Sequence, residues 1–256
     1  MPKITQGITR LQAAGMHLVA SVIIASTILI AMLFVWYPGA YFKLMGGGKL
    51  IFLLFAVDVC LGPLLTLAVF KSGKKHLKFD LAAIVLLQLV AFLYGASILF
   101  QSRPVFTVFT VDQFRVASGM DLKDVDLEKA PKPEWRKRPL LGPVVVAANM
   151  PHDEKEKNEL KFLAVAGLDI DQFPKLYVDY AERRLEILKL AQPLSRLREL
   201  HASNSESVSK FLRDRKQPQE DFVFVPLRGR MDFMAAILDA NTGDFIDVID
   251  ANPYRD

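Results

Sequence analysis

Cysteine is almost absent from this 256-residue chain, which contains only Cys60. No intrachain disulfide can therefore form, whatever the redox state of the compartment. Any soluble part of the chain must be stabilised by its hydrophobic core. The region after residue 102, about 150 residues long, is large enough to bury one.

The recognisable motifs of catalysis are also missing. The chain has no phosphate-binding or dinucleotide-binding glycine pattern and no serine in a nucleophile-elbow context. Neither His152 nor His201 has a cysteine or second histidine at metal-ligand spacing. Several acidic residues lie in turn-like contexts, where formation of surface turns is favoured over catalysis: Asp169, Asp171, Asp239 and Asp244. The sequence predicts no metal, no cofactor and no enzymatic activity.

Acidic residues are scarce in the first 100 positions, which contain two of them against eight Lys and Arg. The rest of the chain has 24 basic and 26 acidic residues of alternating sign. The positive net charge therefore comes from the N-terminal region. Because a nucleic-acid-binding face needs clustered positive charge in a soluble part, nucleic acid is excluded as a partner.

Long apolar runs dominate the same N-terminal region, over residues 17–37, 50–70 and 81–100. Each has the roughly 20 residues that a helix needs to cross a bilayer. The first run follows Lys3 and Arg10 as a secretory signal would, but it is too long for one and ends in Trp36-Tyr37, which is typical of the membrane interface. We interpret it as an uncleaved anchor.

The basic residues at the ends of these runs predict an orientation. The N-terminus and the loop 71–78 share six Lys and Arg, whereas the loop after the first run has only Lys43 and Lys49. The positive-inside rule places the N-terminus in the cytoplasm, and an odd number of spans then exports the C-terminal part. The expected architecture is a three-helix transmembrane region over 1–102 and a small α+β periplasmic domain over 103–256.

Four residues of the second span are candidate partner-binding positions: Asp58, Gly62, Pro63 and Thr66. A carboxyl group at the depth of Asp58 is costly unless it is paired, so it either fixes helix packing or engages a partner helix. Pro63 removes a backbone hydrogen bond and predicts a kink. Either Thr66 satisfies the loosened backbone, or the kink is a notch for another transmembrane segment.

Asp80, at the start of the third run, is expected to cap that helix. It lies some twelve residues closer to the membrane edge than Asp58, about 18 Å along a helix axis, so the two cannot form a protease dyad. His17 and Gln88 are interpreted as isolated packing residues.

In the soluble part, Val105–Val111 predicts a strand, as do 222–227 and 234–238, with a hairpin turn over 239–244. Helices are expected over 151–166, 181–190, 194–200 and from Asn204 or Ser205 to about 213. Residues 117–139 predict a polar loop. Its segment Trp135–Arg138 is either a solvated run or a contact for lipid headgroups or an acidic partner.

A series of short motifs occurs in order along nearly the whole chain: Tyr37-Pro38-Gly39, Asp58 with Leu61-Gly62-Pro63-Leu64-Leu65-Thr66-Leu67, Phe79-Asp80-Leu81, Leu87-Gln88-Leu89, Tyr94-Gly95, Arg103-Pro104-Val105, Val111-Asp112 with Phe114, Pro174 with Tyr177 and Tyr180, Pro226-Leu227, and Thr242-Gly243. In order and spacing they resemble the TfpX/TfpZ family of type IV pilin accessory proteins. The resemblance implies a multi-pass protein of the bacterial inner membrane that binds or stabilises its cognate major pilin before or during polymerisation, in contact with the lipid bilayer and the pilus assembly machinery. An envelope enzyme or sensor that modifies or monitors pilin is the alternative, and a purely structural subunit of the machinery is a third.

Overall fold

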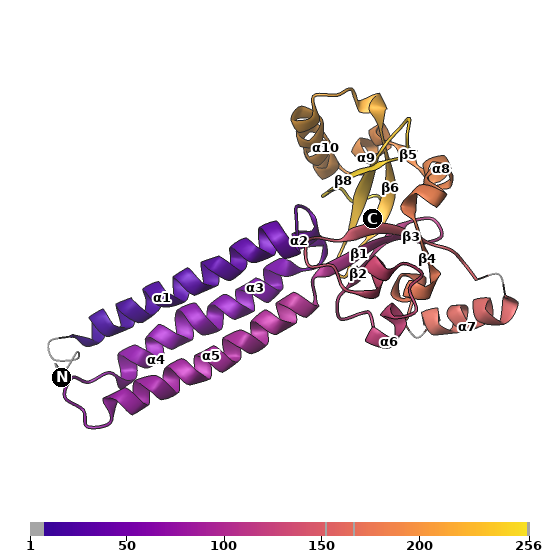
Figure 1. Ribbon diagram of the computed structural model, residues 1–256. Helices are drawn as coiled ribbons and strands as arrows, with labels where there is room; N and C mark the ends of the chain where they lie inside the picture. The colour runs from indigo at the N-terminus through magenta and orange to yellow at the C-terminus, as the bar shows by residue number, and fades with distance from the viewer. Residues whose placement is uncertain (1–7, 152, 166, 255–256) are drawn as a thin grey trace. The chain divides into compact units, whose positions relative to one another are not determined.

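The computed structural model describes residues 8–151, 153–165 and 167–254, and the chain divides into two compact units (Figure 1). The helical unit comprises Met1–Phe34 and Gly47–Gln101, and the sheet domain comprises Val35–Gly46 and Ser102–Asp256. The expected division after residue 102 differs from this in one respect, because residues 35–46 belong to the sheet domain. The expectations for Lys3 and His152 lie outside the described residues.

Three helices of the helical unit are long and apolar enough to cross a membrane, as predicted. The first is α1 (Arg10–Ala31), which continues as the π-helical η1 (Met32–Trp36). The second, called the middle span below, is built from α3 (Gly47–Phe55), the π-helical η2 (Ala56–Leu61) and α4 (Gly62–Val69). The third is α5 (Leu77–Gln101). Each begins before its apolar run, because polar residues outside the bilayer core can continue a helix.

The N-terminus of α1 shows how a span can begin as a helix in polar sequence. Thr9 Oγ1 accepts a hydrogen bond from the Gln12 N–H at 3.2 Å, and Gln12 Oε1 accepts one from the Thr9 N–H at 2.9 Å. This capping box satisfies backbone N–H groups that the first helical turn leaves free.

Asp80 is not the cap of the third span, contrary to expectation. The helix begins at Leu77, so Asp80 lies in its first turn, where its N–H donates to the His76 carbonyl at 3.0 Å. Its carboxylate pairs with Lys74 Nζ at 2.5 Å. A negative charge in the first turn still favours the helix, because it interacts with the positive end of the helix dipole.

Pro63 does not end the middle span. It lies in the first turn of α4, which continues directly from the preceding helical turn, so its missing N–H leaves a carbonyl of that turn without a helical partner. The wider π-helical turn η2 lies directly before it. Such a turn is a known way of accommodating a disturbed hydrogen-bond ladder.

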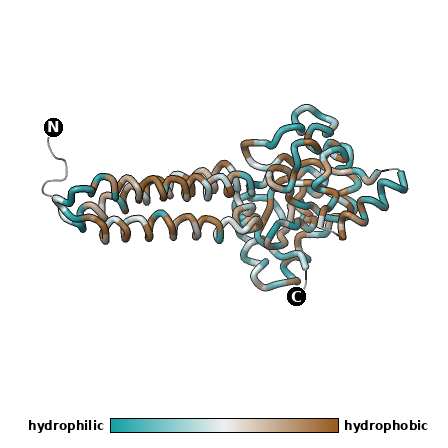
Figure 2. The backbone as a smooth tube through the Cα atoms, turned by 90° about the horizontal axis from the view of Figure 1, so that it is seen from below, coloured by the Kyte–Doolittle hydropathy of each residue, from teal (hydrophilic) through white to brown (hydrophobic). Residues whose placement is uncertain are grey.

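Within the helical unit, α1 and α5 both pack on the middle span. Apolar residues predominate along all three helices (Figure 2), and many large apolar side chains on them are exposed, among them Val19, Phe52 and Leu86. An apolar exterior of this kind is stable in lipid rather than in water.

The sheet domain contains a mixed sheet, with eight strands in the described part of the chain and the order β4-β3-β1-β2-β6-β7-β8, while β5 pairs with β6. The strands are β1 (Pro104–Phe109), β2 (Phe114–Ser118), β3 (Val144–Ala148), β4 (Tyr177–Val178), β5 (Gln192–Pro193), β6 (Phe222–Arg228), β7 (Phe233–Asp239) and β8 (Phe245–Ile249). The pairs β1–β3 and β2–β6 are parallel, and the other pairs are antiparallel. The expected strands over 105–111, 222–227 and 234–238 and the hairpin after them are confirmed, whereas β2, β3, β4 and β5 were not predicted.

The helices of this domain are α2 (Tyr41–Leu44), α6 (Asp124–Leu127), α7 (Glu154–Val165), α8 (Tyr180–Leu190), α9 (Leu194–Leu200) and α10 (Ala202–Arg215), with 3-10 turns η3 (Pro133–Arg136), η4 (Ile170–Gln172), η5 (Pro174–Leu176) and η6 (Gln219–Asp221). Helices were predicted at α7, α8, α9 and α10. The residue before α10 is His201 rather than Asn204 or Ser205. One core cluster includes Phe106 and Tyr177, and another includes Phe211 and Phe222.

Neither interpretation of Trp135–Arg138 is correct for Trp135. This side chain is 4% exposed and packs edge-on against Tyr177, with ring centroids 6.5 Å apart. Arg136 Nε donates to the Ala130 carbonyl at 3.0 Å, and Arg138 Nε donates to the Gly119 carbonyl at 2.7 Å. Two of the basic residues therefore hold this loop together instead of forming a free cationic surface.

The loop 35–46, between the first two spans, is built into the sheet domain. Tyr37 is completely buried there. The Gly142 N–H donates to the Val35 carbonyl at 3.1 Å, and the Met231 N–H donates to the Leu44 carbonyl at 3.2 Å. Because successive helices of the helical unit run in opposite directions, the loop after the first helix and the chain after the third leave the unit at the same end, so the topology allows the two to fold together.

Candidate partner-binding site in the helical unit

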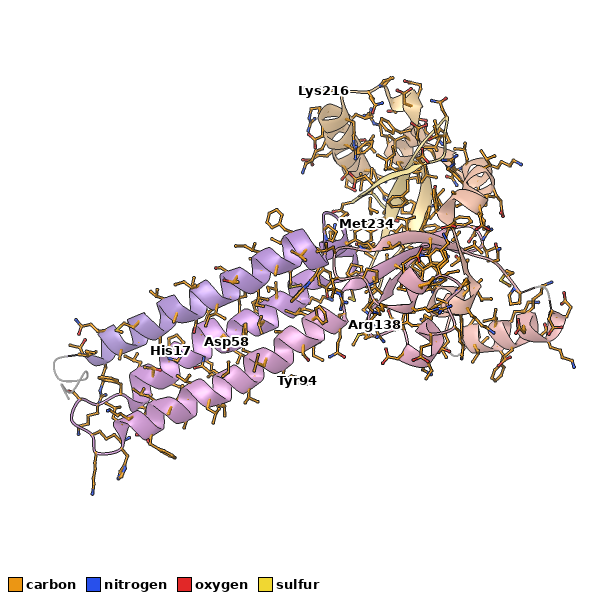
Figure 3. The ribbon with its side chains drawn as sticks, viewed as in Figure 1. His17, Asp58, Tyr94, Arg138, Lys216 and Met234 are labelled. Atoms are coloured by element: carbon orange, nitrogen blue, oxygen red, sulfur yellow. The ribbon has the colours of Figure 1, made fainter. Side chains whose placement is uncertain are left out.

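Polar side chains from all three spans are buried together in the helical unit. They are Ser21 from α1, Asp58 and Thr66 from the middle span, and Gln88 from α5. Figure 3 labels His17 on α1 and Asp58 in the middle span. Polar groups that lipid cannot hydrate need partners within the protein or on another chain.

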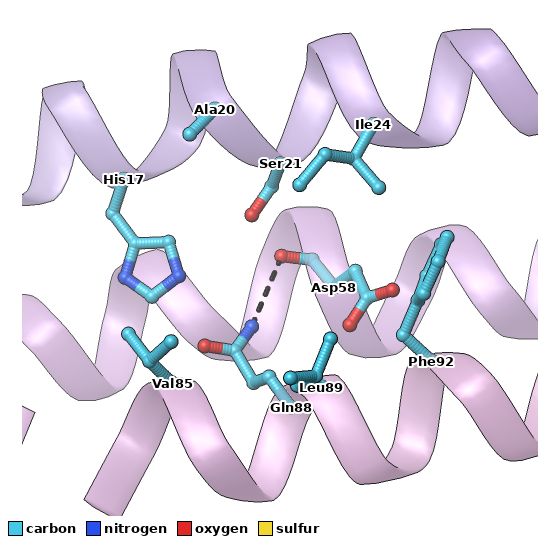
Figure 4. Close-up of a pocket in the computed structure, with 9 residues that line it drawn as sticks. All are labelled: His17, Ala20, Ser21, Ile24, Asp58, Val85, Gln88, Leu89 and Phe92. Atoms are coloured by element: carbon cyan, nitrogen blue, oxygen red, sulfur yellow. Dashed lines mark hydrogen bonds between the residues drawn. The ribbon is translucent and has the colours of Figure 1, made fainter. Parts of the chain in front are cut away.

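Gln88 binds the backbone of the middle span. Its Nε2 donates to the Asp58 carbonyl oxygen at 3.4 Å (Figure 4). In a π-helical turn that carbonyl would accept from the residue five positions later, which is Pro63 and has no N–H. Gln88 therefore performs the role that the sequence suggested for Thr66.

Gly62 makes this interaction possible. A Cβ atom at Gly62 would lie 1.9 Å from Gln88 Nε2, far inside the normal contact distance. The absence of a side chain at Gly62 thus allows the Gln88 amide to lie against the helix backbone. Its role in the structure is internal packing.

Thr66 pairs with α1 instead. Its Oγ1 lies 2.6 Å from Nδ1 of His17, and the Thr66 side chain is buried. His17 and Gln88, which the sequence suggested were isolated packing residues, each have a polar partner on the middle span. Polar residues at these positions are visible in the sequence, but their pairing is not, because it depends on how the spans pack.

The Asp58 carboxyl group is left without such a partner. Asp58 is 6% exposed, and its Oδ2 has no hydrogen bond among the described residues. The Oε1 atom of Gln88 is in the same condition. A buried polar atom without a partner costs about 1–3 kcal/mol, and a carboxyl group in a membrane span costs more if it is charged.

Two cavities, each of about 270 Å³, meet at Asp58. The first lies between α1 and α5 (Figure 4) and is lined by His17, Ala20, Ser21, Ile24, Asp58, Val85, Gln88, Leu89 and Phe92. The second lies between α3 and α5 and is lined by Leu50, Leu54, Val57, Asp58, Ala91, Phe92, Tyr94, Gly95, Ile98 and Leu99. Asp58 and Phe92 line both. A largely apolar cavity with a few polar groups is typical of sites that bind a ligand or a partner.

Of the four candidate positions, Asp58 is the one that lines these cavities. Gly62 supports the site through Gln88, and Thr66 lies inside the unit against His17. Pro63 is half-buried and lines neither cavity. The structure therefore concentrates the candidate site on Asp58 and adds Gln88, Ser21 and Phe92 to it.

Two acidic residues of the sheet domain, Asp169 and Asp171, share a structural partner. Arg115 Nη1 pairs with Asp169 at 2.9 Å, and Arg115 Nε pairs with Asp171 at 2.8 Å. Asp171 is buried, contrary to the expected surface turn, and burial raises the pKa of its carboxyl group although the Arg115 guanidinium opposes the shift. Among the described residues, no three His, Cys, Asp or Glu side chains are grouped to hold a metal ion.

Three helices able to cross a bilayer, cavities between these helices and a mixed-sheet domain indicate the class of membrane-associated proteins. A family model described as fimbrial assembly protein FimB matches residues 6–46. The fimbrial assembly proteins of serogroups I and E1 of Dichelobacter nodosus are each 36% identical over 234 residues, covering 89% of this chain and 90% of theirs. That of serogroups C1 and C2 is 39% identical over 120 residues, covering 46% of this chain and 91% of its own.

The chain therefore belongs to the fimbrial assembly protein family, and these relatives support a role in pilus biogenesis. This agrees with the broader implication of the TfpX/TfpZ resemblance, a pilus assembly family. No solved structure matches the chain.

Proposed function

We propose that this protein is a non-catalytic accessory factor of the bacterial inner membrane that binds its cognate type IV pilin before or during polymerisation. The cavity between α1 and α5 carries the proposal, because it is lined by Asp58, whose Oδ2 has no hydrogen bond among the described residues. Its occupant is the apolar membrane-spanning helix of pilin.

The packing of the helical unit supports this proposal. Because α1 and α5 both pack on the middle span, the space between them opens beside Asp58. Ala20 and Ser21 line its α1 side and are small, and small residues let helix backbones approach closely in membranes. A partner helix there would bury apolar side chains and supply polar contacts at the same time.

The orientation belongs to the same proposal, with the N-terminus in the cytoplasm and the sheet domain in the periplasm. The Lys-rich residues 71–78 connect the second and third spans. Lys43, the one basic residue of the loop 35–46, is ion-paired to Asp250 in the sheet domain at 2.7 Å. The exported domain would then contact the globular part of pilin.

Site-specific photocrosslinking in piliated cells tests the proposal. A photoreactive residue at Ile24 or Leu89, both of which line the first cavity, is expected to crosslink to pilin. The matched controls are the neighbouring exposed positions Ile23 and Leu86, which do not line it and are expected to give little pilin product. Equal yields from the two sets, or no pilin product from any position, would contradict the proposal.

The enzyme alternative gives a different result. A modifying enzyme changes the mass of purified pilin when it is present, whereas an accessory factor changes the number of fibres and leaves pilin mass the same. Mass spectrometry of pilin from cells with and without the protein separates the two.

A further inference from the structure

We infer that the two cavities are successive parts of one groove for a single transmembrane helix, and that the Asp58 carboxyl group recognises a neutral hydrogen-bonding side chain on that helix. This inference rests on the proposed function. It adds the length of the bound segment and the chemistry of its central contact.

The spacing of the lining residues on α5 supports a single groove. The residues of α5 that line one cavity or the other follow one another along the helix without a gap of more than three positions: Val85, Gln88, Leu89, Ala91, Phe92, Tyr94, Gly95, Ile98 and Leu99. Because neighbouring positions point to different sides of a helix, this lining turns partly around α5 instead of following a single face. From Val85 to Leu99 it extends about 21 Å at 1.5 Å per residue, roughly two-thirds of the bilayer core.

The junction of the cavities is built from Asp58 and Phe92, which line both. Leu54 of α3 and Gly95 of α5, which both line the second cavity, are in close contact, because a Cβ atom at Gly95 would lie 2.8 Å from Leu54 Cδ1. Asp58 therefore lies between an α1-side part and an α3-side part of the groove. A helix lying along α5 would pass it near the middle of its bound length.

The hydrogen bonding of the Asp58 side chain indicates which chemical class of side chain the occupant brings to it. Gln88 binds the Asp58 backbone carbonyl, and Oδ2 of the carboxyl group has no hydrogen bond among the described residues. A lipid acyl chain fills apolar space but supplies no hydrogen-bond donor or acceptor. A hydroxyl, amide or carboxyl side chain on a partner helix supplies one, and such contacts between helices in lipid stabilise association.

The mostly apolar lining favours a neutral partner over a cationic one. Apart from Asp58, the lining residues of both cavities are uncharged, with His17 bonded to Thr66. A lysine or arginine from the partner would pair with Asp58, but both charges would then be buried among these uncharged residues. A neutral contact avoids placing an ion in this environment.

The inference is tested by the yield of crosslinks to pilin from a photoreactive residue at Ile24, in the first cavity, or at Ile98, in the second. Exposed Leu93, which lines neither cavity, is the control for Ile98. Asp58→Leu is expected to lower the yield at both positions roughly 3- to 20-fold, the range for one interhelical hydrogen bond. Asp58→Asn keeps a hydrogen-bonding group and is expected to stay within about twofold of the unsubstituted protein. Cys60→Ala, at an exposed position of the same π-helical turn, controls for a general effect of substitution there.

The outcomes separate the inference from the proposed function. Unchanged yields with Asp58→Leu, or equal losses with Asp58→Asn and Asp58→Leu, overturn the role of a neutral hydrogen bond while pilin binding remains. Pilin products from Ile24 but none from Ile98 overturn the single groove. No pilin product from any position of the unsubstituted protein overturns the proposed function itself.

Discussion

The hydroxyl oxygen of Tyr41 lies 2.7 Å from Oγ1 of Thr107, and both side chains are buried in the sheet domain. Tyr41 belongs to the loop between the first two spans, whereas Thr107 lies in β1 just after the third. This hydrogen bond and the burial of Tyr37 make residues 35–46 a structural part of the domain. The ends of the first two spans are thereby connected to the same fold as the C-terminal part.

Tyr41→Phe is expected to lower the free energy of unfolding of the sheet domain by about 1–3 kcal/mol, because the Thr107 hydroxyl is left buried without its partner. Denaturation of the full chain in detergent, followed by tyrosine and tryptophan fluorescence, measures this change. Lys43→Ala serves as the control in the same loop. Its ion pair with Asp250 is largely exposed, so removing it costs less than about 1 kcal/mol. An effect of Lys43→Ala as large as that of Tyr41→Phe would contradict this account of the loop.

Gly62→Ala is expected to destabilise the helical unit by about 1–3 kcal/mol, because the new Cβ atom displaces the Gln88 amide from the Asp58 carbonyl. In a Gln88→Ala background the same substitution has less to displace and is expected to cost much less. Thermal unfolding of the four proteins in detergent forms a double-mutant cycle. Additive effects would show that the two residues do not interact.

The hairpin turn after β7 predicts a pH effect. Oδ1 of Asp239 accepts hydrogen bonds from the Asn241 and Thr242 N–H groups at 2.8 Å each, and these bonds lower the pKa of the carboxyl group. The stabilisation is therefore present above the unfolded pKa of about 3.9 and is lost as pH falls through the lower folded pKa.

Asp239→Asn keeps the acceptor oxygen but cannot titrate, so its thermal midpoint should fall less than that of the unsubstituted protein below about pH 4. Asp239→Ala removes the acceptor and should lower the midpoint throughout the neutral range as well. Melting curves between about pH 2.5 and 7 distinguish the three proteins. Parallel acid limbs for the unsubstituted protein and the Asp239→Asn variant would exclude this carboxyl group as a contributor.

Topology reporters test the orientation. A phosphatase that is active only in the periplasm is expected to be active when fused after Asp256 and inactive when inserted at Gly73, between the second and third spans. A reporter active only in the cytoplasm should give the reverse pattern. Cytoplasmic activity after Asp256 would invert the proposed orientation but would leave the three spans in place.

Elements that a local sequence pattern marks were predicted correctly, whereas elements that depend on contacts between distant residues were missed. The strand Val105–Val111 and the helix 181–190 were predicted because local patterning marks them, and they appear as β1 and α8. Strand β3 was missed because it pairs in parallel with the distant β1. Trp135 was assigned to an exposed or headgroup-binding run because its neighbours are charged, yet its indole ring packs beside Tyr177.

For the candidate site, the sequence alone identified Asp58, because a carboxyl group is unusual at that depth in an apolar run. It also determined the three spans, since about 20 consecutive apolar residues are enough to predict a membrane helix. Packing between the spans decided the rest. It assigned the Asp58 carbonyl to Gln88 and the Thr66 hydroxyl to His17, and it left the Asp58 carboxyl group open to two cavities. Such pairings join residues up to 49 positions apart and depend on how the helices face one another, which no local pattern in the sequence specifies.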